Sequence, residues 1–454
     1  MRFLRWSRLM AVASMLSVMV IQAGAESRFP QPDFESAYQP PATTAPSPRA
    51  NIMEYADVAV LFLALSLASY LILKRRSRRG LFLLTLFSLA YFGFYREGCI
   101  CPVGSVQNVT LALFDRGYAV PLTVVAFFAL PLFFSLLFGR AFCAAVCPLG
   151  AIQDLVVFKP LRVPRPLAHA LGMLPYLYLG GAVIFAATGS AFLICRYDPF
   201  VAFFRMTGEF GMVLFGAGML ILGTVVARPY CRFLCPYGVL LNWTSRFSWK
   251  HMAITPDTCI SCRLCEEACP FDCIRTPTQK RDWEPRTVGR RRLALQLLLL
   301  PVLAAAGAWI GGWFHVPMSH LDRTVALAEQ VAREERGEPV PATDARDAFR
   351  ESEQTEEELY GEATGQRQHF ESGGRLFGGF TGVVFGCTLI GLTLQRRRVD
   401  YEPDRATCFS CGRCFMSCPR EHLRRGLITE MEASAAADEY KNAPLAAPSF
   451  ERKS

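Results

Sequence analysis

The sequence predicts an all-α polytopic membrane bundle of about seven spans, with a cysteine-rich module on one face that a transmembrane hairpin divides. Three observations support this prediction. The 454 residues are 52% hydrophobic, which is more apolar than an ordinary soluble enzyme. Seventeen cysteines fall mostly in tight groups beside basic loops, a pattern that favours metal binding over disulfides. Seven apolar stretches approach the roughly 20 residues that cross a bilayer. They lie at about 57–73, 81–97, 119–139, 169–191, 209–227, 293–314 and 376–395.

The first 56 residues are expected to carry a targeting signal and a linker. Three arginines precede an apolar run from Leu9 to Ile21, which ends at the small residues Ala23-Gly24-Ala25. This pattern is typical of a secretory signal peptide at residues 1–25, with an uncleaved anchor as the alternative. Residues 26–56 are rich in proline and are expected to form a periplasmic linker.

Basic residues orient the predicted spans. If the spans alternate, Lys and Arg gather on one side, which the positive-inside rule makes the cytoplasm of a bacterial inner membrane. This clustering also accounts for the formal net charge of +9 without nucleic-acid binding. We therefore expect a five-span domain at 57–250, a periplasmic N-terminus, and a cytoplasmic C-terminus that ends in a disordered tail at 431–454.

The predicted periplasmic loop at 315–374 is acidic. It holds 14 Asp or Glu against 6 Arg, a net charge of 6 − 14 = −8. A solvated spacer and a docking surface for a basic periplasmic partner are both compatible with it, and an amphipathic helix is predicted around Leu321–Arg336. His315 and His320 could bind a metal or quinol there, although a plain interfacial role is favoured.

Two segments share the spacing C-x₂-C-x₂-C-x₃-C-P, from Cys259 to Pro270 and from Cys408 to Pro419. In bacterial ferredoxins with this spacing, three cysteines hold one [4Fe–4S] cluster and the fourth ligates the sister cluster. Zinc also accepts four thiolates, but it needs neither the third cysteine nor the proline. The predicted ligands are Cys259, Cys262, Cys265 and Cys418 for the first cluster, and Cys408, Cys411, Cys414 and Cys269 for the second.

The two halves of this ferredoxin module are separated in the sequence. The first half is expected at 251–285 and the second at 399–430, with the transmembrane hairpin at 286–398 between them. Both halves follow or precede basic, cytoplasm-type segments, so the module is expected to close against the cytoplasmic face of the membrane.

A second group of cysteines belongs to an internal repeat. Gly139–Gly150 resembles Ala227–Gly238, and each copy follows an inward-running span and contains C-x₃-C-P. Residues at i and i+4 lie on one helix face, which suits shared ligation. The candidate metal or cluster ligands are Cys143, Cys147, Cys231 and Cys235. A structural turn with reduced, unliganded thiols is the alternative.

A third group is predicted at the outer ends of the second and fourth spans. It contains Cys99, Cys101 and Cys195, and aligning the prolines that follow places Asp198 opposite Cys101. An outward-facing iron–sulfur or other metal site, a disulfide with one remaining thiol, and no function are all open. Cys273 and Cys387, which belong to no group, are interpreted as packing residues.

Taken together, these motifs resemble the NosR/NapH family of membrane polyferredoxins over residues 57–420. The resemblance implies electron transfer between cytoplasmic or quinol donors and a periplasmic redox system, including nitrous oxide or nitrate respiration. NosR-type proteins carry a periplasmic FMN domain, which is not evident in this sequence, so a flavin would come from a partner. No C-x-x-C-H motif for covalent haem occurs, and no catalytic residues are predicted.

Two other functions remain alternatives. An assembly or regulatory factor for a periplasmic metalloenzyme would fit the acidic loop. An ion-coupled redox pump is disfavoured, because the carboxylates Asp198 and Glu209 lie only near the ends of predicted spans.

Overall fold

The computed structural model describes residues 50–98, 101–158, 160–205, 210–254, 259–278, 285–340, 343–393 and 398–435. The predicted signal peptide, most of the linker, Cys99, Glu209 and most of the tail lie outside the described residues.

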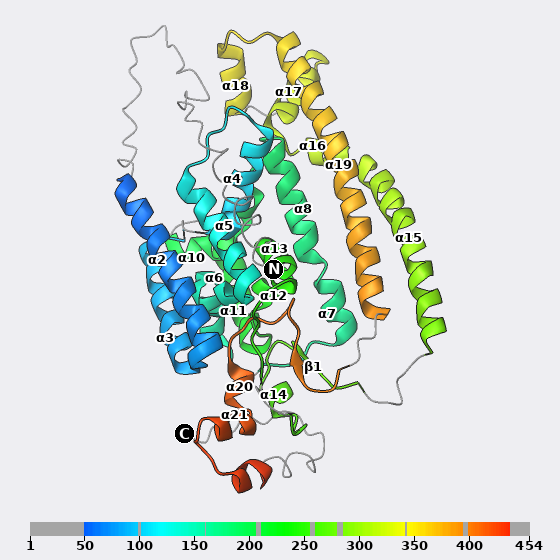
Figure 1. Ribbon diagram of the computed structural model, residues 1–454. Coiled ribbons are helices and arrows are strands. Elements are labelled where there is room, and N and C mark those ends of the chain that lie inside the picture. The colour runs from blue at the N-terminus through cyan, green and yellow to red at the C-terminus, as the bar shows by residue number, and fades with distance from the viewer. Residues whose placement is uncertain are drawn as a thin grey trace, which may run out of the picture.

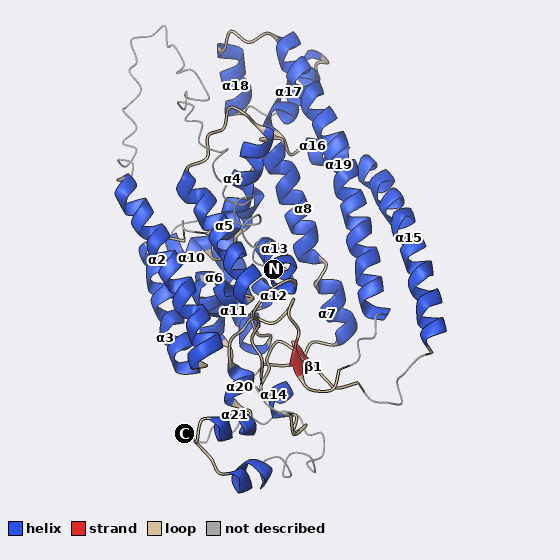
Figure 2. Ribbon diagram, viewed as in Figure 1, coloured by secondary structure: helices blue, strands red, loops and turns tan. Residues whose placement is uncertain are grey.

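The described chain is almost entirely helical, with one small sheet (Figure 2). The helices form an elongated bundle, with the ferredoxin segments at one end and the helices α17 (Arg323–Glu335) and α18 (Asp344–Glu351) at the other (Figure 1). Up to residue 250 the elements are α2 (Asn51–Tyr70), η1 (Leu71–Arg75), α3 (Arg78–Ser88), η2 (Leu89–Tyr95), α4 (Pro102–Phe114), α5 (Leu122–Phe138), η3 (Phe142–Val146), α6 (Pro148–Val156), α7 (Arg165–Leu171), α8 (Leu174–Ala187), α9 (Leu193–Tyr197), α10 (Val201–Arg205), α11 (Phe210–Val225), α12 (Pro229–Phe233) and α13 (Pro236–Arg246). The remaining elements are α14 (Leu264–Glu267), β1 (Ile274–Arg275), α15 (Arg286–Trp313), α16 (His315–Ser319), α17 (Arg323–Glu335), α18 (Asp344–Glu351), α19 (Glu356–Thr393), β2 (Glu402–Pro403), α20 (Arg413–Met416) and α21 (Pro419–Arg424).

Four helical segments of the described chain are long and apolar enough to cross a membrane. They are Asn51–Arg75, Pro166–Ala187, Thr287–Trp313 and Glu356–Thr393. The other three predicted spans coincide with shorter or less apolar helices: α3 with η2, α5, and α11. A helix of 17 residues, the length of α5, extends only about 26 Å, so length and composition alone identify four candidate spans among the described residues. The first span begins at Asn51, within the segment expected to be linker, because the prolines of that segment end at Pro48 and none interrupts the helix.

The predicted hairpin is formed by α15 and α19, which pack backbone against backbone (Figure 1). A β-carbon on Gly307 would lie 2.2 Å from the carbonyl oxygen of Gly378, and one on Gly378 would lie 2.0 Å from that of Gly307. Small residues allow this close approach, which is typical of helix pairs in membranes. The hairpin meets the bundle through α8, where the rings of Phe185 and Phe370 are 5.3 Å apart.

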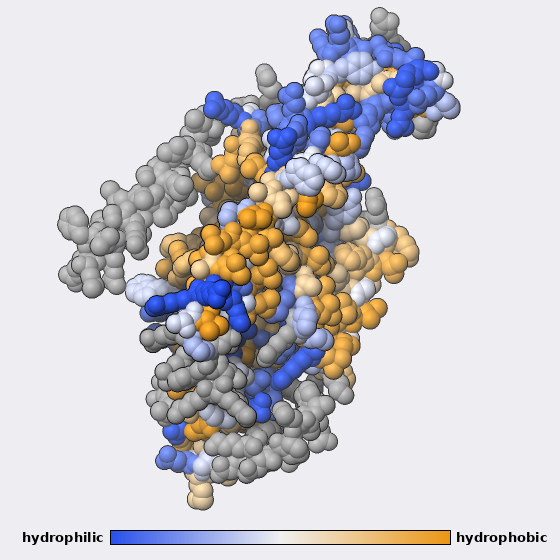
Figure 3. Space-filling view, turned by 90° about the vertical axis from the view of Figure 1, so that its right-hand side faces the viewer, coloured by the Kyte–Doolittle hydropathy of each residue, from blue (hydrophilic) through white to orange (hydrophobic). Residues whose placement is uncertain are grey.

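Hydrophobic residues cover the middle of the face over the hairpin, and hydrophilic residues cover the end that carries α17 and α18 (Figure 3). The predicted amphipathic helix is confirmed as α17, and Asp322 caps it by accepting hydrogen bonds from the N–H groups of Thr324 and Val325. The acidic loop is folded, because α17, α18 and the start of α19 share a small core. That core contains Val325, Ala328, Val331, Phe349, Leu359 and Ala363.

The two ferredoxin halves are in contact at the opposite end of the bundle. Strands β1 and β2 pair antiparallel, with Ile274 opposite Pro403. The guanidinium of Arg275 also forms an ion pair with Asp404 at 2.7 Å. Burial opposes ionisation of Asp404, but the hydrogen bond and charge of Arg275 hold its pKa below the usual range. The pairing closes one unit from segments that lie on either side of the hairpin.

Candidate iron–sulfur centres

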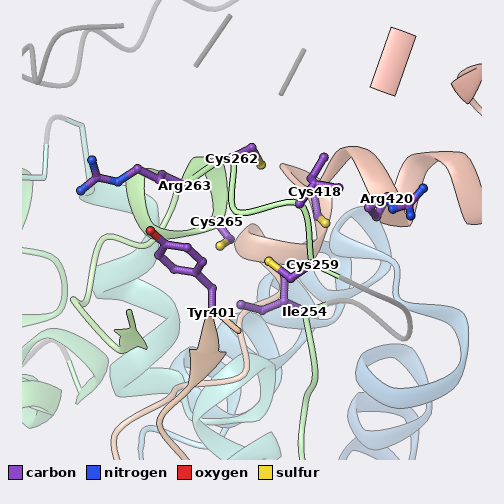
Figure 4. Close-up of a pocket in the computed structure, with 9 residues that line it drawn as sticks. Ile254, Cys259, Cys262, Arg263, Cys265, Tyr401, Cys418 and Arg420 are labelled. Atoms are coloured by element: carbon purple, nitrogen blue, oxygen red, sulfur yellow. The ribbon is translucent and has the colours of Figure 1, made fainter. Parts of the chain in front are cut away.

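The predicted ligands of the first cluster surround one pocket (Figure 4). Cys259, Cys262 and Cys265 come from the loop and helix around α14, and Cys418 directly precedes α21. The other lining residues are Ile254, Ile260, Arg263, Tyr401 and Arg420. Four sulfurs with apolar and cationic neighbours suit an anionic thiolate-bound cluster.

Both ferredoxin halves use the same local geometry. In the first half Ser261 has a φ of +55°, and its N–H lies 3.4 Å from the sulfur of Cys259. In the second half Ser410 has a φ of +52°, and its N–H lies 3.4 Å from the sulfur of Cys408. These left-handed turns point backbone donors at sulfur, which stabilises a negatively charged ligand.

The second set of predicted ligands is also brought together. Cys408 and Cys414 lie close enough to Cys269 for their charges to interact. Burial raises the pKa of Cys408 to about 12, so its thiol stays protonated unless a metal displaces the proton. Cys273, interpreted as a packing residue, donates to the carbonyl oxygen of Thr407 at 3.0 Å and links the two halves.

No group of three or more His, Cys, Asp or Glu side chains in the described ranges is arranged to hold a single metal ion. A single zinc would require sulfurs about 2.3 Å from one point, whereas a four-iron cluster separates its ligands further.

A buried carboxylate joins the second half to the bundle. Asp154 forms ion pairs with Arg78 at 2.9 Å, Arg413 at 3.2 Å and Arg228 at 3.5 Å. Arg413 lies between two predicted cluster ligands, and the other two arginines belong to the bundle. Burial opposes ionisation of Asp154, but the three positive charges hold its pKa well below the usual range.

A second buried carboxylate, Glu421, repeats this arrangement. It forms ion pairs with Arg76 at 3.0 Å and with Arg424 and Arg425 at 2.9 Å each. Arg76 also donates to the carbonyl oxygen of Ala253, at the start of the first half. Two buried carboxylates therefore fix the ferredoxin halves on the bundle.

The four cysteines of the internal repeat also meet. Cys143 lies in η3 and Cys147 directly precedes α6, while Cys231 lies in α12 and Cys235 directly precedes α13. Each lies close enough to others of the set for their charges to interact. We call this set the CxxxCP site.

Two buried arginines cross between the repeats at the CxxxCP site. Arg140 of the first copy lies 3.4 Å from the β-carbon position of Gly238 in the second, and Arg228 of the second lies 3.3 Å from that of Gly150 in the first. The reciprocal contacts show that the repeat is a structural pseudo-symmetry. At both positions the absence of a side chain lets the guanidinium of the other copy pack closely against the backbone.

The donors around the CxxxCP site suit a negatively charged group. The Nη2 atom of Arg140 lies 3.8 Å from the sulfur of Cys143, and the amide of Gln153 donates to the sulfur of Cys231 at 3.3 Å. The Nε atoms of Arg140 and Arg228 are buried and have no hydrogen-bond partner within the described residues. Unpaired buried donors are unfavourable, so an anionic cluster held by these cysteines fits the site.

The same arginines reach the second ferredoxin half. The guanidinium carbon of Arg140 lies 4.5 Å from the ring centroid of Phe409, and that of Arg228 lies 5.7 Å from it. Phe409 separates the predicted ligands Cys408 and Cys411. The arginines of the CxxxCP site therefore contact a residue of the second ferredoxin site.

The third group is partly described. The structure brings Cys101, Cys195 and Asp198 close enough for their charges to interact, whereas Cys99 lies outside the described residues. No disulfide joins two of the cysteines that the structure describes.

The third group lies next to the CxxxCP site. Cys101 directly precedes α4, which runs toward the end of the bundle that carries α17 and α18 (Figure 1). Tyr230 lies close to both Cys101 and Cys235. The predicted outer-edge position of this group, which depends on the orientation of the spans, stays a prediction.

The remaining candidates have other contacts. The ring nitrogen Nδ1 of His315 contacts the carbonyl oxygen of Gly312, and that of His320 lies 2.7 Å from the carboxylate of Glu329. Cys387 is exposed on α19. The sequence reasoning did not identify Gln153 and Asp154, although both directly follow the first CxxxCP motif and could have been found there.

Comparisons with known proteins agree with these sites. A family model described as a 4Fe-4S binding domain matches residues 120–164 and 207–252, which contain the CxxxCP motifs. A second model with the same description matches residues 252–275, which contain the first ferredoxin motif. No solved structure matches the chain significantly.

Three relatives match parts of the chain. An uncharacterized protein of Methanocaldococcus jannaschii is 27% identical over 196 residues, which are 41% of this chain and 79% of the relative. YccM of Escherichia coli, named as a candidate electron transport protein, is 29% identical over 201 residues, or 39% of this chain and 54% of the relative. Protein NirI of Paracoccus denitrificans is 28% identical over 154 residues, or 31% of this chain and 22% of the relative.

The chain thus spans just over half of the E. coli relative and about a fifth of the Paracoccus one. The family models cover the two CxxxCP motifs and the first ferredoxin motif, which are part of the resemblance seen in the sequence. The chain carries 4Fe–4S binding domains and is similar to membrane-type polyferredoxins of the NosR/NapH kind, in agreement with the resemblance seen in the sequence.

Proposed function

We propose that the chain passes electrons along a row of three iron–sulfur centres. Each centre, when bound, accepts and releases one electron. The first two would be [4Fe–4S] clusters on the ferredoxin cysteines with crossed ligation, and the third would be held at the CxxxCP site. An electron needs intermediate redox centres of this kind to cross a hydrocarbon core that is about 30 Å thick.

The observation that supports this proposal best is the position of Arg228. Its side chain is 1% exposed, and it lies close enough to Cys231, Cys143 and Cys411 to interact with the charge of each. Arg228 therefore lies beside both the CxxxCP site and the second ferredoxin site. Cys414 likewise lies near Cys265 of the first ferredoxin site, so each proposed centre has a close neighbour.

The arginines also have an electrostatic role. An added electron makes a thiolate-bound centre more negative, and a buried positive charge stabilises that state strongly where water is excluded. Arg140 forms no ion pair with a carboxylate among the described residues, whereas Arg228 shares Asp154 with two other arginines. The surplus positive charge favours electron acceptance at this point of the row.

We further propose an orientation and partners. The basic segments beside the ferredoxin halves support a cytoplasmic position for them in the inner membrane, with the folded acidic segment in the periplasm and about seven spans in all. Electrons would then pass between cytoplasmic or quinol donors and a periplasmic redox protein or flavin-carrying partner. Support for a respiratory pathway such as nitrous oxide or nitrate reduction comes from the family resemblance.

Iron and acid-labile sulfide in anaerobically purified protein test the proposal. About eight irons per chain correspond to the two ferredoxin clusters alone, and about twelve or more require a centre in the membrane domain. The double substitution Cys147→Ser and Cys231→Ser is expected to remove about four irons and leave the EPR signals of the ferredoxin clusters intact. An unchanged iron content would contradict a centre at the CxxxCP site.

An assembly or regulatory factor remains a second candidate because the acidic segment has its own core. Deleting residues 325–370 distinguishes the two functions. Loss of maturation of a periplasmic metalloenzyme, with cluster reduction intact, would favour the factor. Loss of electron delivery to a mature enzyme would favour the electron carrier.

A further inference from the structure

Three helices of the bundle begin with the same turn. Each starts at the proline of a Cys-Pro-x-Gly segment, at Cys101–Gly104 for α4, Cys147–Gly150 for α6 and Cys235–Gly238 for α13. The first two segments share one more residue, a glutamine six positions after the cysteine. These glutamines, Gln107 and Gln153, are both fully buried.

The two glutamines hold equivalent partners. The side-chain oxygen of Gln153 accepts a hydrogen bond from the N–H of Tyr230 at 3.1 Å, and Cys231 is the next residue. The side-chain oxygen of Gln107 accepts from the N–H of Ile194 at 2.9 Å, and Cys195 is the next residue. Each glutamine thus fixes one cysteine-bearing helix against the turn that carries another cysteine.

This correspondence equates Cys101 and Cys195 with Cys147 and Cys231 of the CxxxCP site. The sulfur of Cys195 lies 3.2 Å from the β-carbon position of Gly104, so it sits against the first turn of α4. Asp198 lies near Cys101, is only 4% exposed, and accepts a hydrogen bond from the N–H of Phe200 at 2.9 Å.

The surroundings of the two glutamines differ at one atom, the side-chain nitrogen. The side-chain nitrogen of Gln153 donates to the sulfur of Cys231 at 3.3 Å and to the carbonyl oxygen of Leu149 at 2.7 Å. The side-chain nitrogen of Gln107 is buried and has no partner within the described residues. Buried donors are almost always paired in folded proteins, so this donor indicates a missing acceptor beside Cys195.

We propose that Cys101, Cys195 and Asp198 ligate a further iron–sulfur centre within the membrane domain, and that Gln107 donates a hydrogen bond to one of its sulfurs. The inference rests on the proposed function, because it extends the row beyond the CxxxCP site. Tyr230, which lies near both Cys101 and Cys235, separates the two centres. One electron gained at the further centre is one electron lost at the CxxxCP site, so the step needs no other reactant.

The exposure of Cys195 suits the end of a row. It is exposed whereas Cys231 is half-buried, and a terminal centre must come close to the surface to meet a redox partner. Hydrogen bonds to the sulfurs of a centre raise its reduction potential by stabilising the reduced, more negative form. Gln107 is therefore expected to act as a positioning residue that also tunes this centre.

The test compares two double variants in full-length, anaerobically purified protein. Cys101→Ser with Cys195→Ser is expected to lose iron and sulfide relative to wild type, with the EPR signals of the ferredoxin clusters intact. Cys147→Ser with Cys231→Ser should lose a separate share of iron. Cys387→Ser, a cysteine outside every group, is the matched control and should retain all iron.

The outcomes separate the two proposals. If only the Cys147 and Cys231 variant loses iron, the further centre does not exist and the proposed function stands. If neither double variant loses iron, both proposals fail. The ferredoxin EPR signals serve as an internal check that each variant is folded.

A single substitution tests the further centre independently if the Cys101 and Cys195 variant does not fold. Gln107→Leu keeps both sulfurs and should retain iron. It should make reduction of the further centre at least tenfold less favourable, which is about 59 mV for one electron. Gln153→Leu should shift the CxxxCP centre instead. A wild-type set of potentials in Gln107→Leu overturns the assignment of Gln107.

Discussion

Replacing Asp154 with asparagine removes a carboxylate that three arginines share. The ion-pair distances are 2.9, 3.2 and 3.5 Å, and the exposed fractions of the Arg78, Arg413 and Arg228 side chains are 19%, 24% and 1%. Removing one partner of a buried ion pair costs about 3–5 kcal/mol. Because water reaches two of the three guanidinium groups, we expect a loss of about 3 kcal/mol, the lower end of that range.

The pH of the measurement follows from the pKa of Asp154. Because its pKa is lowered in the folded protein, the stabilisation is fully present above the unfolded value of about 3.9 and disappears as the pH falls through the folded value. The comparison therefore belongs at pH 7, where the wild-type carboxylate is ionised in both states.

The assay is reversible denaturation in mixed micelles, followed by tryptophan fluorescence. Glu338→Gln is the control, because Glu338 pairs with Arg336 at 3.0 Å and both side chains are at least half exposed. An exposed pair of this kind contributes about 0–1 kcal/mol. If Asp154→Asn is no less stable than Glu338→Gln, the buried carboxylate does not hold the ferredoxin module on the bundle, and the reasoning is refuted.

Three further predictions concern other parts of the chain. Arg140→Gln removes a buried charge 3.8 Å from the sulfur of Cys143 and should lower the midpoint potential of the CxxxCP centre by roughly 90 mV, or about 2 kcal/mol, in an EPR redox titration. Burial and the charge of Arg405 lower the pKa of His251 to about 4. The free energy of unfolding therefore keeps its full value above the unfolded pKa of about 6.5 and decreases as the pH falls, by roughly 2 kcal/mol at pH 5. His251→Asn should flatten this pH dependence when denaturation is measured over a series of pH values. Gly378→Ala places a β-carbon 2.0 Å from a carbonyl oxygen of α15 and should lower the melting temperature of the hairpin.

Each of these predictions has a result that contradicts it. An unchanged potential in Arg140→Gln would mean that the charge does not act on a redox centre. Identical pH profiles for wild type and His251→Asn would show that other groups govern stability in that window. Gly391→Ala, on the same helix with open space around it, is the control for Gly378→Ala, and equal melting temperatures for the two would show that the helices separate without cost.

The large elements were predictable because each depends on local pattern. Hydropathy indicated the hairpin, and the spacing of apolar residues indicated the helix now described as α17. The ferredoxin cysteines were found from spacing alone, and the structure brings them together across the hairpin. By contrast, three predicted spans coincide with helices that are shorter or less apolar than a full crossing requires, because hydropathy alone does not fix where a helix begins and ends.

The supporting residues of the sites could not be predicted in the same way. Gln107 and Ile194 are 87 residues apart, and Asp154 and Arg413 are 259 apart. Buried hydrogen bonds and ion pairs between such distant residues leave no local signature in one sequence. The repeated Cys-Pro-x-Gly turn was a usable signal, because its third copy at Cys101 follows the same rule as the other two.

The interrupted ferredoxin module has a consequence for how the protein is made. The ribosome completes Cys269 well before it reaches Cys408, and in between it must synthesise α15, the acidic segment and α19. Under crossed ligation, neither cluster has all four of its cysteines until α19 and the second ferredoxin half have been synthesised. Cluster assembly would then begin only after the hairpin is complete. A chain that stalls within the hairpin would carry only the cysteines of the first ferredoxin half and could complete neither cluster.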